Sequence, residues 1–122
     1  MESRLDHFGE FIMAHLRDPG IQFWEILATG QWKAPALAAL QERVAAMATD
    51  QREVVRDCVI HAIDHATHDF LFALQEESDT QQSICMEVDG ADVAAESDGL
   101  QGEPYGENGW IARFSQFPGA FD

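Results

Sequence analysis

The longest helical pattern of apolar and polar positions runs from residue 50 to residue 77 and predicts one central helix. No proline or glycine occurs between Asp50 and Gly90, and Asp50 and Glu53 have the spacing of a capping box. At about 100° per residue, one narrow stripe along this helix is apolar. The stripe consists of Val55, Val59, Ala62, Ala66, Phe70 and Ala73. We therefore expect its small residues to contact another helix closely.

A polar strip lies opposite this stripe and raises the question of metal binding. The strip contains Asp57, His61, Asp64, His68 and Gln75, with His65 at its edge. Three histidines at i, i+4 and i+7 can present their imidazoles on one face, and Cys58 can add a thiolate. An amphipathic helix also needs a polar face, where acid–histidine pairs at i, i+4 are ordinary. We interpret the strip as polar surface. The alternative is a metal-binding helical protein or small metalloenzyme that uses His61, His65, His68 and Cys58.

Three shorter helices are predicted before the central one. Residues 3–17 have helical apolar spacing and begin at Ser3 as a potential N-cap, and the sequence Asp18-Pro19-Gly20 is expected to end that helix. Residues 21–28 predict a second helix, and residues 34–48 a third one with Pro35 in its first turn. Four helices with short connections favour an antiparallel bundle or an orthogonal cluster.

After residue 77 the pattern changes to that of strands and turns. Residues 83–88 and 92–96 are strand candidates on either side of Asp89-Gly90, a hairpin turn signal. A glycine-rich loop follows, then a third strand candidate at residues 110–114 and a tail at residues 117–122. The fold class predicted is α+β: an N-terminal cluster of about four helices, then a small antiparallel sheet of two or three strands. Residues 1–122 form a single domain, with a helical part (1–77) and an acidic β/loop part (78–122).

Length and composition indicate an ordinary globular domain. The chain has 122 residues, of which 46% are apolar, enough for a hydrophobic core. No apolar run approaches the roughly 20 residues of a membrane span. The N-terminus lacks the basic start and apolar stretch of a secretory signal. Two cysteines do not make a disulfide framework. We expect a cytoplasmic protein with free thiols.

The formal net charge of −15 is the strongest global signal. Residues 76–122 contain eleven acidic residues, and Arg113 is their only Lys or Arg. This argues against nucleic-acid binding, which relies on neutralisation of phosphates by Lys and Arg, and equally against anionic membranes. A basic protein partner would instead be attracted by such a surface.

The sequence contains no catalytic motif that we recognise. Neither cysteine lies in a nucleophile signature, GxSxG is absent, and the glycines have no phosphate-loop order. The acidic residues after residue 88 do not have EF-hand spacing. We therefore expect no enzyme activity and no cofactor. In the acidic loop, Tyr105 and Trp110 can either anchor the loop to the core or act as partner anchors inside a charged rim; we expect Trp110 to be largely core and Tyr105 to be the more exposed of the two. The predicted partner-binding residues are Asp89, Asp92, Glu96, Asp98, Glu103, Tyr105, Glu107 and Trp110.

Residues 102–114, GEPYGENGWIARF, carry a resemblance to known proteins. They resemble the tails of small uncharacterised bacterial proteins, some of which are similar to immunity proteins of polymorphic toxin systems. The resemblance implies a cytoplasmic protein that binds and blocks a cognate toxin, and it transfers no specific binding residue. We favour a non-enzymatic, immunity-type protein-binding module that inhibits a basic bacterial toxin or enzyme. A structural domain without a dedicated ligand is the third possibility.

Overall fold

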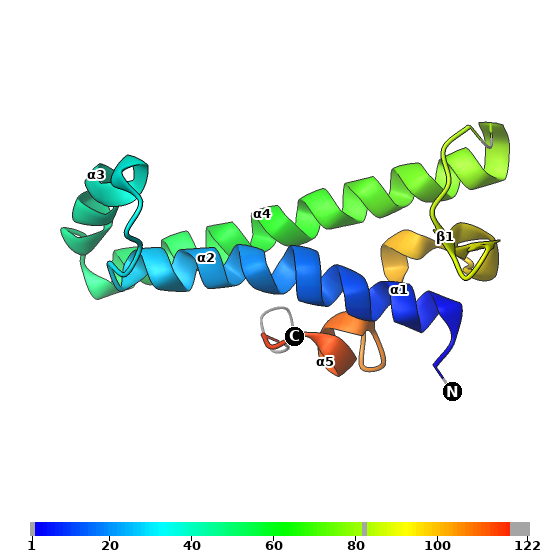
Figure 1. Cartoon of the computed structure of the whole chain (residues 1–122). Coiled ribbons are helices and arrows are strands. Elements are labelled where there is room, and N and C mark those ends of the chain that lie inside the picture. The colour runs from blue at the N-terminus through cyan, green and yellow to red at the C-terminus, as the bar shows by residue number, and fades with distance from the viewer. Residues whose placement is uncertain (1, 82, 118–122) are drawn as a thin grey trace.

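The chain folds around two long antiparallel helices, as the computed structural model shows (Figure 1). The structure describes residues 2–81 and 83–117. The first long helix is built from three consecutive segments, and α3 connects it to the second, α4. The bounds are α1 (Arg4–Ile12), the π-helical turn η1 (Met13–Arg17), α2 (Asp18–Ala28), α3 (Pro35–Ala45) and α4 (Thr49–Glu76). No helix within the described part is long and apolar enough to cross a membrane.

The first long helix begins where the sequence predicts but does not end there. The Ser3 hydroxyl accepts a hydrogen bond from the Asp6 backbone N–H at 3.0 Å, which confirms the N-cap. The predicted end at Asp18-Pro19-Gly20 is wrong, because α1, η1 and α2 follow one another without a break. Proline inside a helix clashes with the carbonyl four residues earlier. Here the wider π turn precedes Pro19, with the Asp18 N–H bonded to the Met13 carbonyl, so the helix continues past the proline.

Tertiary contacts hold this helix together at the predicted break. A Cβ at Gly20 would lie 2.7 Å from the Ile63 Cδ1 atom of α4, so glycine allows the two long helices to approach closely here. Arg17 and Asp18 are both buried and bind the C-terminal segment. These contacts stabilise a helix that local sequence signals alone would end.

Helix α4 matches the predicted central helix in its bounds but not in the face it buries. At its start, the Ala48 N–H donates to the Gln51 side chain at 2.9 Å, so Gln51 and not Glu53 makes the capping contact. The buried residues of α4 are Ile60, Asp64, Thr67, Leu71, Leu74 and Gln75. The predicted buried stripe is wrong in its central and C-terminal part, since four of its members are exposed. These are Ala62, Ala66, Phe70 and Ala73.

The polar residues on the buried face explain this orientation. Asp64 is paired with Arg17. The Gln75 side chain accepts from the Leu100 N–H at 2.8 Å and donates to the Ala94 carbonyl at 3.0 Å. Buried polar groups are tolerated when they are hydrogen-bonded. Asp64 and Gln75 of the predicted polar strip therefore pack inward, whereas Asp57, His61 and His65 of the same strip are exposed.

Helix α3 closes the end of the hairpin where the two long helices meet. Its bounds fall within the predicted residues 34–48, and Pro35 occupies its first turn. Val44 packs with Trp24 and Leu27 of α2 in a small second core. Val55 and Val59 of α4 are half-buried against this cluster.

The sheet is smaller than predicted and its turn is as predicted. Strands β1 (Glu87–Val88) and β2 (Ala91–Asp92) pair antiparallel. Asp89 and Gly90 have φ values of 52° and 82°, as a two-residue hairpin turn requires. The chain then leaves the strand conformation and forms the 3-10 helix η3 (Val93–Glu96). The prediction of an α+β fold with a helical cluster and a small antiparallel sheet is confirmed.

The predicted third strand at residues 110–114 is wrong, because these residues form helix α5 (Trp110–Phe114). Trp110 and Ile111 are buried and Phe114 is half-buried. Positions i, i+1 and i+4 share one side of a helix, whereas neighbouring residues of a strand point to opposite faces. Of the predicted tail at residues 117–122, only Phe117 lies within the described residues.

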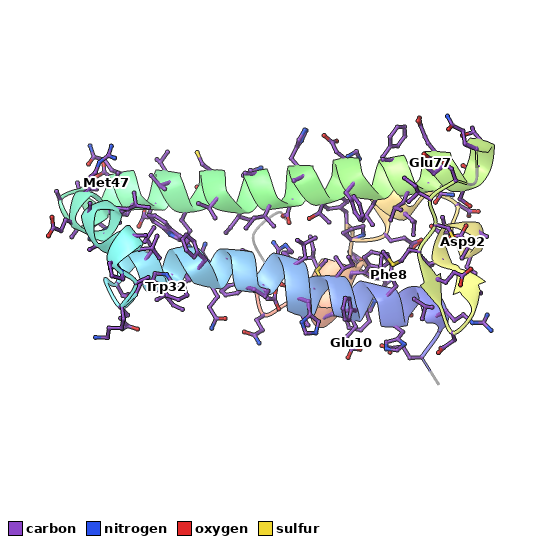
Figure 2. All side chains as sticks on the ribbon, turned by 45° about the horizontal axis from the view of Figure 1, so that its top comes forward. Phe8, Glu10, Trp32, Met47, Glu77 and Asp92 are labelled. Atoms are coloured by element: carbon purple, nitrogen blue, oxygen red, sulfur yellow. The ribbon has the colours of Figure 1, made fainter. Side chains whose placement is uncertain are left out.

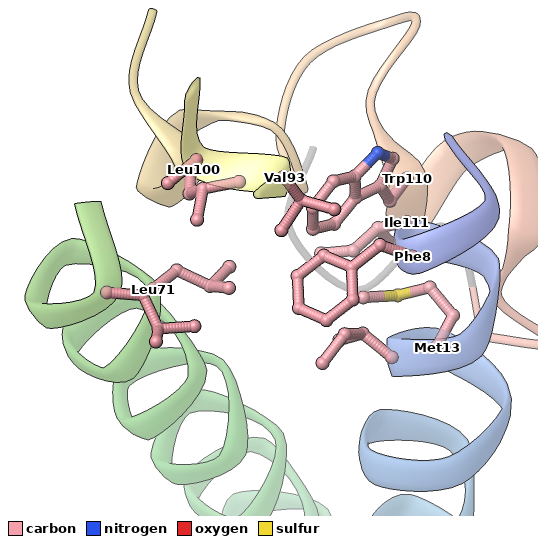
Figure 3. Close-up of a cluster of buried hydrophobic side chains, with 10 residues drawn as sticks. Phe8, Met13, Leu71, Val93, Leu100, Trp110 and Ile111 are labelled. Carbon is pink, nitrogen blue, oxygen red and sulfur yellow. The ribbon is translucent and has the colours of Figure 1, made fainter. Parts of the chain in front are cut away.

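The main core lies where the C-terminal segment packs against both long helices (Figure 3). Phe8 and Met13 come from the first long helix and Leu71 comes from α4. The Phe8 and Trp110 rings meet edge to face, with centroids 5.9 Å apart and planes at 89°. Val93 and Leu100, the latter in the 3-10 helix η4 (Leu100–Gly102), complete the contact. The C-terminal third of the chain is therefore an integral part of the fold.

Gly9 is the position in α1 where this core leaves no space for a side chain. A Cβ atom at Gly9 would overlap the Trp110 indole ring. We expect Gly9→Ala to lower the free energy of unfolding by about 1–3 kcal/mol through overpacking, as measured by urea denaturation. Gly102→Ala is the control, because a Cβ there has no atom within 4 Å. Equal stabilities of the two variants would contradict this packing.

Candidate functional site

The acidic loop that precedes α5 is a compact, hydrogen-bonded structure. The Trp110 and Ile111 N–H groups donate to the carbonyls of Glu103 and Pro104, both at 3.0 Å. Pro104 is fully buried. A Cβ at Gly109 would collide with the backbone of Pro104 and Tyr105, so this position requires glycine. The loop thus presents its outward side chains from a fixed backbone.

Three of the predicted acidic residues form hydrogen bonds or ion pairs within the fold. Asp92 accepts from the Ser78 hydroxyl at 2.7 Å and from the Ala94 N–H at 3.0 Å, which caps η3. Glu96 forms an ion pair with Arg4 at 2.9 Å. The Glu103 carboxylate accepts from the Ser97 hydroxyl at 3.1 Å. These three side chains contribute to the local structure.

The other three predicted carboxylates point outward. Asp89 lies in the β1–β2 turn, Asp98 precedes η4, and Glu107 lies in the loop before α5. All three residues are exposed, and none has an ion-pair partner among residues 2–81 and 83–117. We call these three residues, which lie in three different connections, the acidic surface: Asp89, Asp98 and Glu107. They are the predicted site residues whose charge is available to a partner.

The two predicted aromatic anchors lie in different environments. Trp110 has no exposed surface, so it belongs to the core and its assignment as a partner contact is corrected. Tyr105 is 37% exposed, and its hydroxyl donates to the Asp64 carbonyl at 3.1 Å. Burial, followed by the nearby Asp64 charge, raises the pKa of Tyr105 above its ordinary value. Tyr105 therefore remains a neutral donor whose side chain is partly exposed.

A second group of carboxylates, which the sequence analysis missed, lies on α1 and just before it. Glu2 and Glu10 are close enough that a hydrogen bond between their side chains raises the pKa of Glu2. Asp6 pairs with Arg113 of α5 at 2.8 Å, and this contact lowers the pKa of Asp6 below its ordinary value. The spacing of four between Glu2, Asp6 and Glu10 is the signal in the sequence. The guanidinium of Arg113 is thereby bound to a carboxylate of the same chain.

The histidines of α4 lie along one open hollow. It is lined by His61, Ala62, Asp64, His65, Ala66, His68, Asp69 and Tyr105 and has a volume of about 870 Å³. Asp69 is the common neighbour of His65 and His68, with N–O distances of 3.4 and 3.3 Å. Cys58 is exposed. Among the residues that the structure describes, no three His, Cys, Asp or Glu side chains are placed to hold a metal ion.

We expect the purified protein to be independent of metal. A chelator should leave its melting temperature unchanged, because a ligand stabilises only a folded state that binds it. The measurement is a thermal melt with and without chelator, together with elemental analysis. About one zinc, nickel or iron per chain that disappears in both His61→Ala and His65→Ala variants would contradict our interpretation of the strip.

A buried ion pair fixes the C-terminal segment to the helical hairpin. Arg17 has no exposed surface, and its Nε and Nη2 atoms donate to Asp64 at 2.8 and 3.3 Å. Its Nη1 atom donates to the Ser115 hydroxyl at 2.7 Å and the Phe117 carbonyl at 2.9 Å. Asp18 accepts from the Gln116 N–H at 2.9 Å. This network connects η1, α2, α4 and the segment after α5.

Comparison with known proteins adds no functional assignment. No family model, curated protein or solved structure matches this chain. The functional argument therefore rests on the geometry and charge of the residues described above.

Proposed function

We propose that this chain is a non-enzymatic protein-binding module that recognises a basic protein partner. The observation that carries the proposal is that Asp89, Asp98 and Glu107 are exposed and have no ion-pair partner among the described residues, in a part of the chain with a single Lys or Arg. Arg113 is that cation, and it is paired with Asp6. The charges of Asp89, Asp98 and Glu107 are therefore not neutralised by the residues that the structure describes, and they are available to a cationic surface.

The physical basis of recognition is electrostatic attraction followed by local contacts. A surface with unneutralised carboxylates accelerates the approach of a basic protein and fixes its orientation. Tyr105 supplies an amphipathic side chain in the loop that carries Glu107, and tyrosine is enriched among residues that anchor interfaces.

The most concrete form of this function is immunity-type inhibition in the cytoplasm. The chain would cover the cationic surface of a basic bacterial toxin or enzyme and so exclude its substrate. Two features support this proposal: the acidic surface, and the resemblance of residues 102–114 to the tails of immunity-like bacterial proteins. Those residues form the loop that carries Tyr105 and Glu107, together with helix α5.

A charge-reversal experiment tests the proposal. Immobilised wild-type chain is expected to capture a basic protein from the source cell, and the double variant Asp98→Lys/Glu107→Lys is expected to lose it. The control is Glu42→Lys/Asp50→Lys, which changes the net charge equally at two exposed positions elsewhere. Captured proteins are identified by mass spectrometry. If the immobilised Asp98→Lys/Glu107→Lys variant captured the same basic protein as the wild-type chain, the proposal would be contradicted.

A further inference from the structure

Asn108 is the only asparagine of the chain, and it is followed by Gly109. Asparagine before glycine is especially prone to spontaneous deamidation, because glycine has no Cβ that would hinder attack of its backbone nitrogen on the asparagine side chain. Asn108 is exposed and directly follows Glu107 in the acidic loop. Helix α5 comes next and packs against α1, the part of the first long helix where Figure 2 labels Phe8 and Glu10.

The reaction at this pair is a cyclisation followed by hydrolysis, and its only co-reactant is water. The Gly109 backbone nitrogen forms a bond to the Asn108 Cγ atom. The Cγ–Nδ2 bond breaks, and the side-chain nitrogen leaves as ammonia with the Gly109 amide proton. Water then opens the five-membered imide ring. Opening at Cγ gives aspartate, whereas opening at the main-chain carbonyl carbon gives isoaspartate, whose backbone is longer by one methylene group. Both products carry one additional negative charge.

Two hydrogen bonds hold the reacting peptide group in the folded loop. The Gly109 N–H donates to the Gly106 carbonyl at 3.1 Å, and the Asn108 carbonyl accepts from the Arg113 Nε atom at 2.8 Å. The imide nitrogen carries no hydrogen, so the first bond is lost when the ring forms. The Asn108 carbonyl carbon becomes a ring atom, so the peptide group that Arg113 holds has to move. Gly109 is buried against the backbone of residues 104–105, which leaves little space for that movement.

We propose that Asn108 is a spontaneous modification site of this chain and that the loop before α5 controls its rate. The closed loop withholds the Gly109 nitrogen from Cγ, so the rate follows the fraction of time that the loop is open. The aspartate product adds a carboxylate next to Glu107 of the acidic surface. This chemistry requires no partner, so it is independent of the proposed recognition of a basic protein.

The two products differ in how they fit the fold. The N–H groups of Gly109, Trp110 and Ile111 donate to the carbonyls of Gly106, Glu103 and Pro104 at 3.1, 3.0 and 3.0 Å. Aspartate leaves the backbone unchanged and retains these bonds. The extra methylene group of isoaspartate displaces the donors relative to their acceptors. Because Trp110 is fully buried, this displacement also disturbs the main core.

The deamidation rate of the full chain, followed by peptide mass spectrometry in one buffer, tests the control by the loop. Residue 108 should react at least about tenfold more slowly in the native chain than in the chain unfolded in urea, because only the open loop reacts. Arg113→Ala should accelerate the native reaction at least about threefold, because it removes the hydrogen bond to the Asn108 carbonyl. Asp6→Asn is the control, since it breaks the Asp6–Arg113 ion pair and retains the Arg113 Nε donor.

Three results would overturn the proposal. The first is a native wild-type rate equal to the rate in urea, which would show that the loop does not restrain the reaction. The second is the same native rate in Arg113→Ala and Asp6→Asn, with circular dichroism unchanged in both. The third is a modified fraction that persists in Asn108→Gln, because glutamine would have to form a larger ring and reacts far more slowly.

The stability of the isolated products tests the structural consequence. Aged chain is separated by chromatography into its isoaspartate and aspartate forms, and the variant Asn108→Asp provides the aspartate form directly. We expect Asn108→Asp to melt close to the wild type, as for an exposed substitution, and the isoaspartate form to melt at a clearly lower temperature. The two forms have the same charge, so the difference reports the backbone alone. Equal melting temperatures would show that the loop accommodates the longer backbone.

Discussion

Replacing Asp64 with alanine is expected to lower the free energy of unfolding by about 3–5 kcal/mol, because it breaks a buried ion pair by removing its carboxylate. The Arg17 guanidinium is fully buried and makes two hydrogen bonds to Asp64. Its bonds to Ser115 and Phe117 are to neutral groups. Urea denaturation followed by circular dichroism measures the loss.

Two further variants distinguish the loss of the buried ion pair from a general effect of removing a carboxylate from α4. Asp57→Ala changes an exposed residue of the same predicted polar strip, and we expect it to alter stability by less than about 0.5 kcal/mol. The double variant Arg17→Met/Asp64→Leu should recover much of the loss, because apolar replacement of a whole buried ion pair is often close to neutral. If Asp64→Ala were as mild as Asp57→Ala, Arg17 would not depend on this partner.

Replacing Trp110 with alanine is the second large effect that we expect, again a loss of about 3–5 kcal/mol of unfolding free energy. The indole is fully buried, packs edge to face on Phe8 and fills the space that Gly9 leaves open. Its removal leaves a cavity between α1 and the C-terminal segment. Thermal and urea unfolding provide the measurement.

Tyr105→Ala is the matched control for the tryptophan variant, because it removes an aromatic side chain from the same loop. Tyr105 is partly exposed and makes one hydrogen bond, to the Asp64 carbonyl. We expect a loss of about 1–2 kcal/mol. A Trp110→Ala variant of wild-type stability would instead place the indole at the surface.

The parts of the fold that could be predicted from the sequence are those with local causes. A serine three residues before a backbone donor predicts the N-cap at Ser3, and Asp89-Gly90 predicts a turn that needs two positive φ values. The absence of proline and glycine predicts the length of α4. In each case the neighbouring residues determine the conformation.

The parts that could not be predicted depend on contacts between distant residues. Asp57 and Asp64 are equivalent in a helical pattern, yet only Asp64 meets Arg17, which lies 47 positions earlier in the chain. The burial of Asp64 and Gln75 turns α4 so that Ala66 and Phe70 point outward. Likewise, Pro19 is a helix-ending signal until the π turn and the packing of Gly20 on Ile63 are known.

The same reasoning applies to the acidic site. Sequence identifies where carboxylates are concentrated but not which of them are already bound. Asp92, Glu96 and Glu103 accept hydrogen bonds from Ser78, Arg4 and Ser97. The acidic surface consists of three other carboxylates: Asp89, Asp98 and Glu107. Only the folded arrangement of the donors distinguishes the two groups.

The most direct measurement of the proposed function is the association rate constant between this chain and its captured basic partner as a function of salt. We predict fast association at low ionic strength and a steep decrease as salt rises, because steering acts through screened charge. Asp98→Lys/Glu107→Lys should lower the rate constant far more than the control Glu42→Lys/Asp50→Lys does. An association rate constant that changes with neither salt nor the reversal of Asp98 and Glu107 would contradict recognition through the acidic surface.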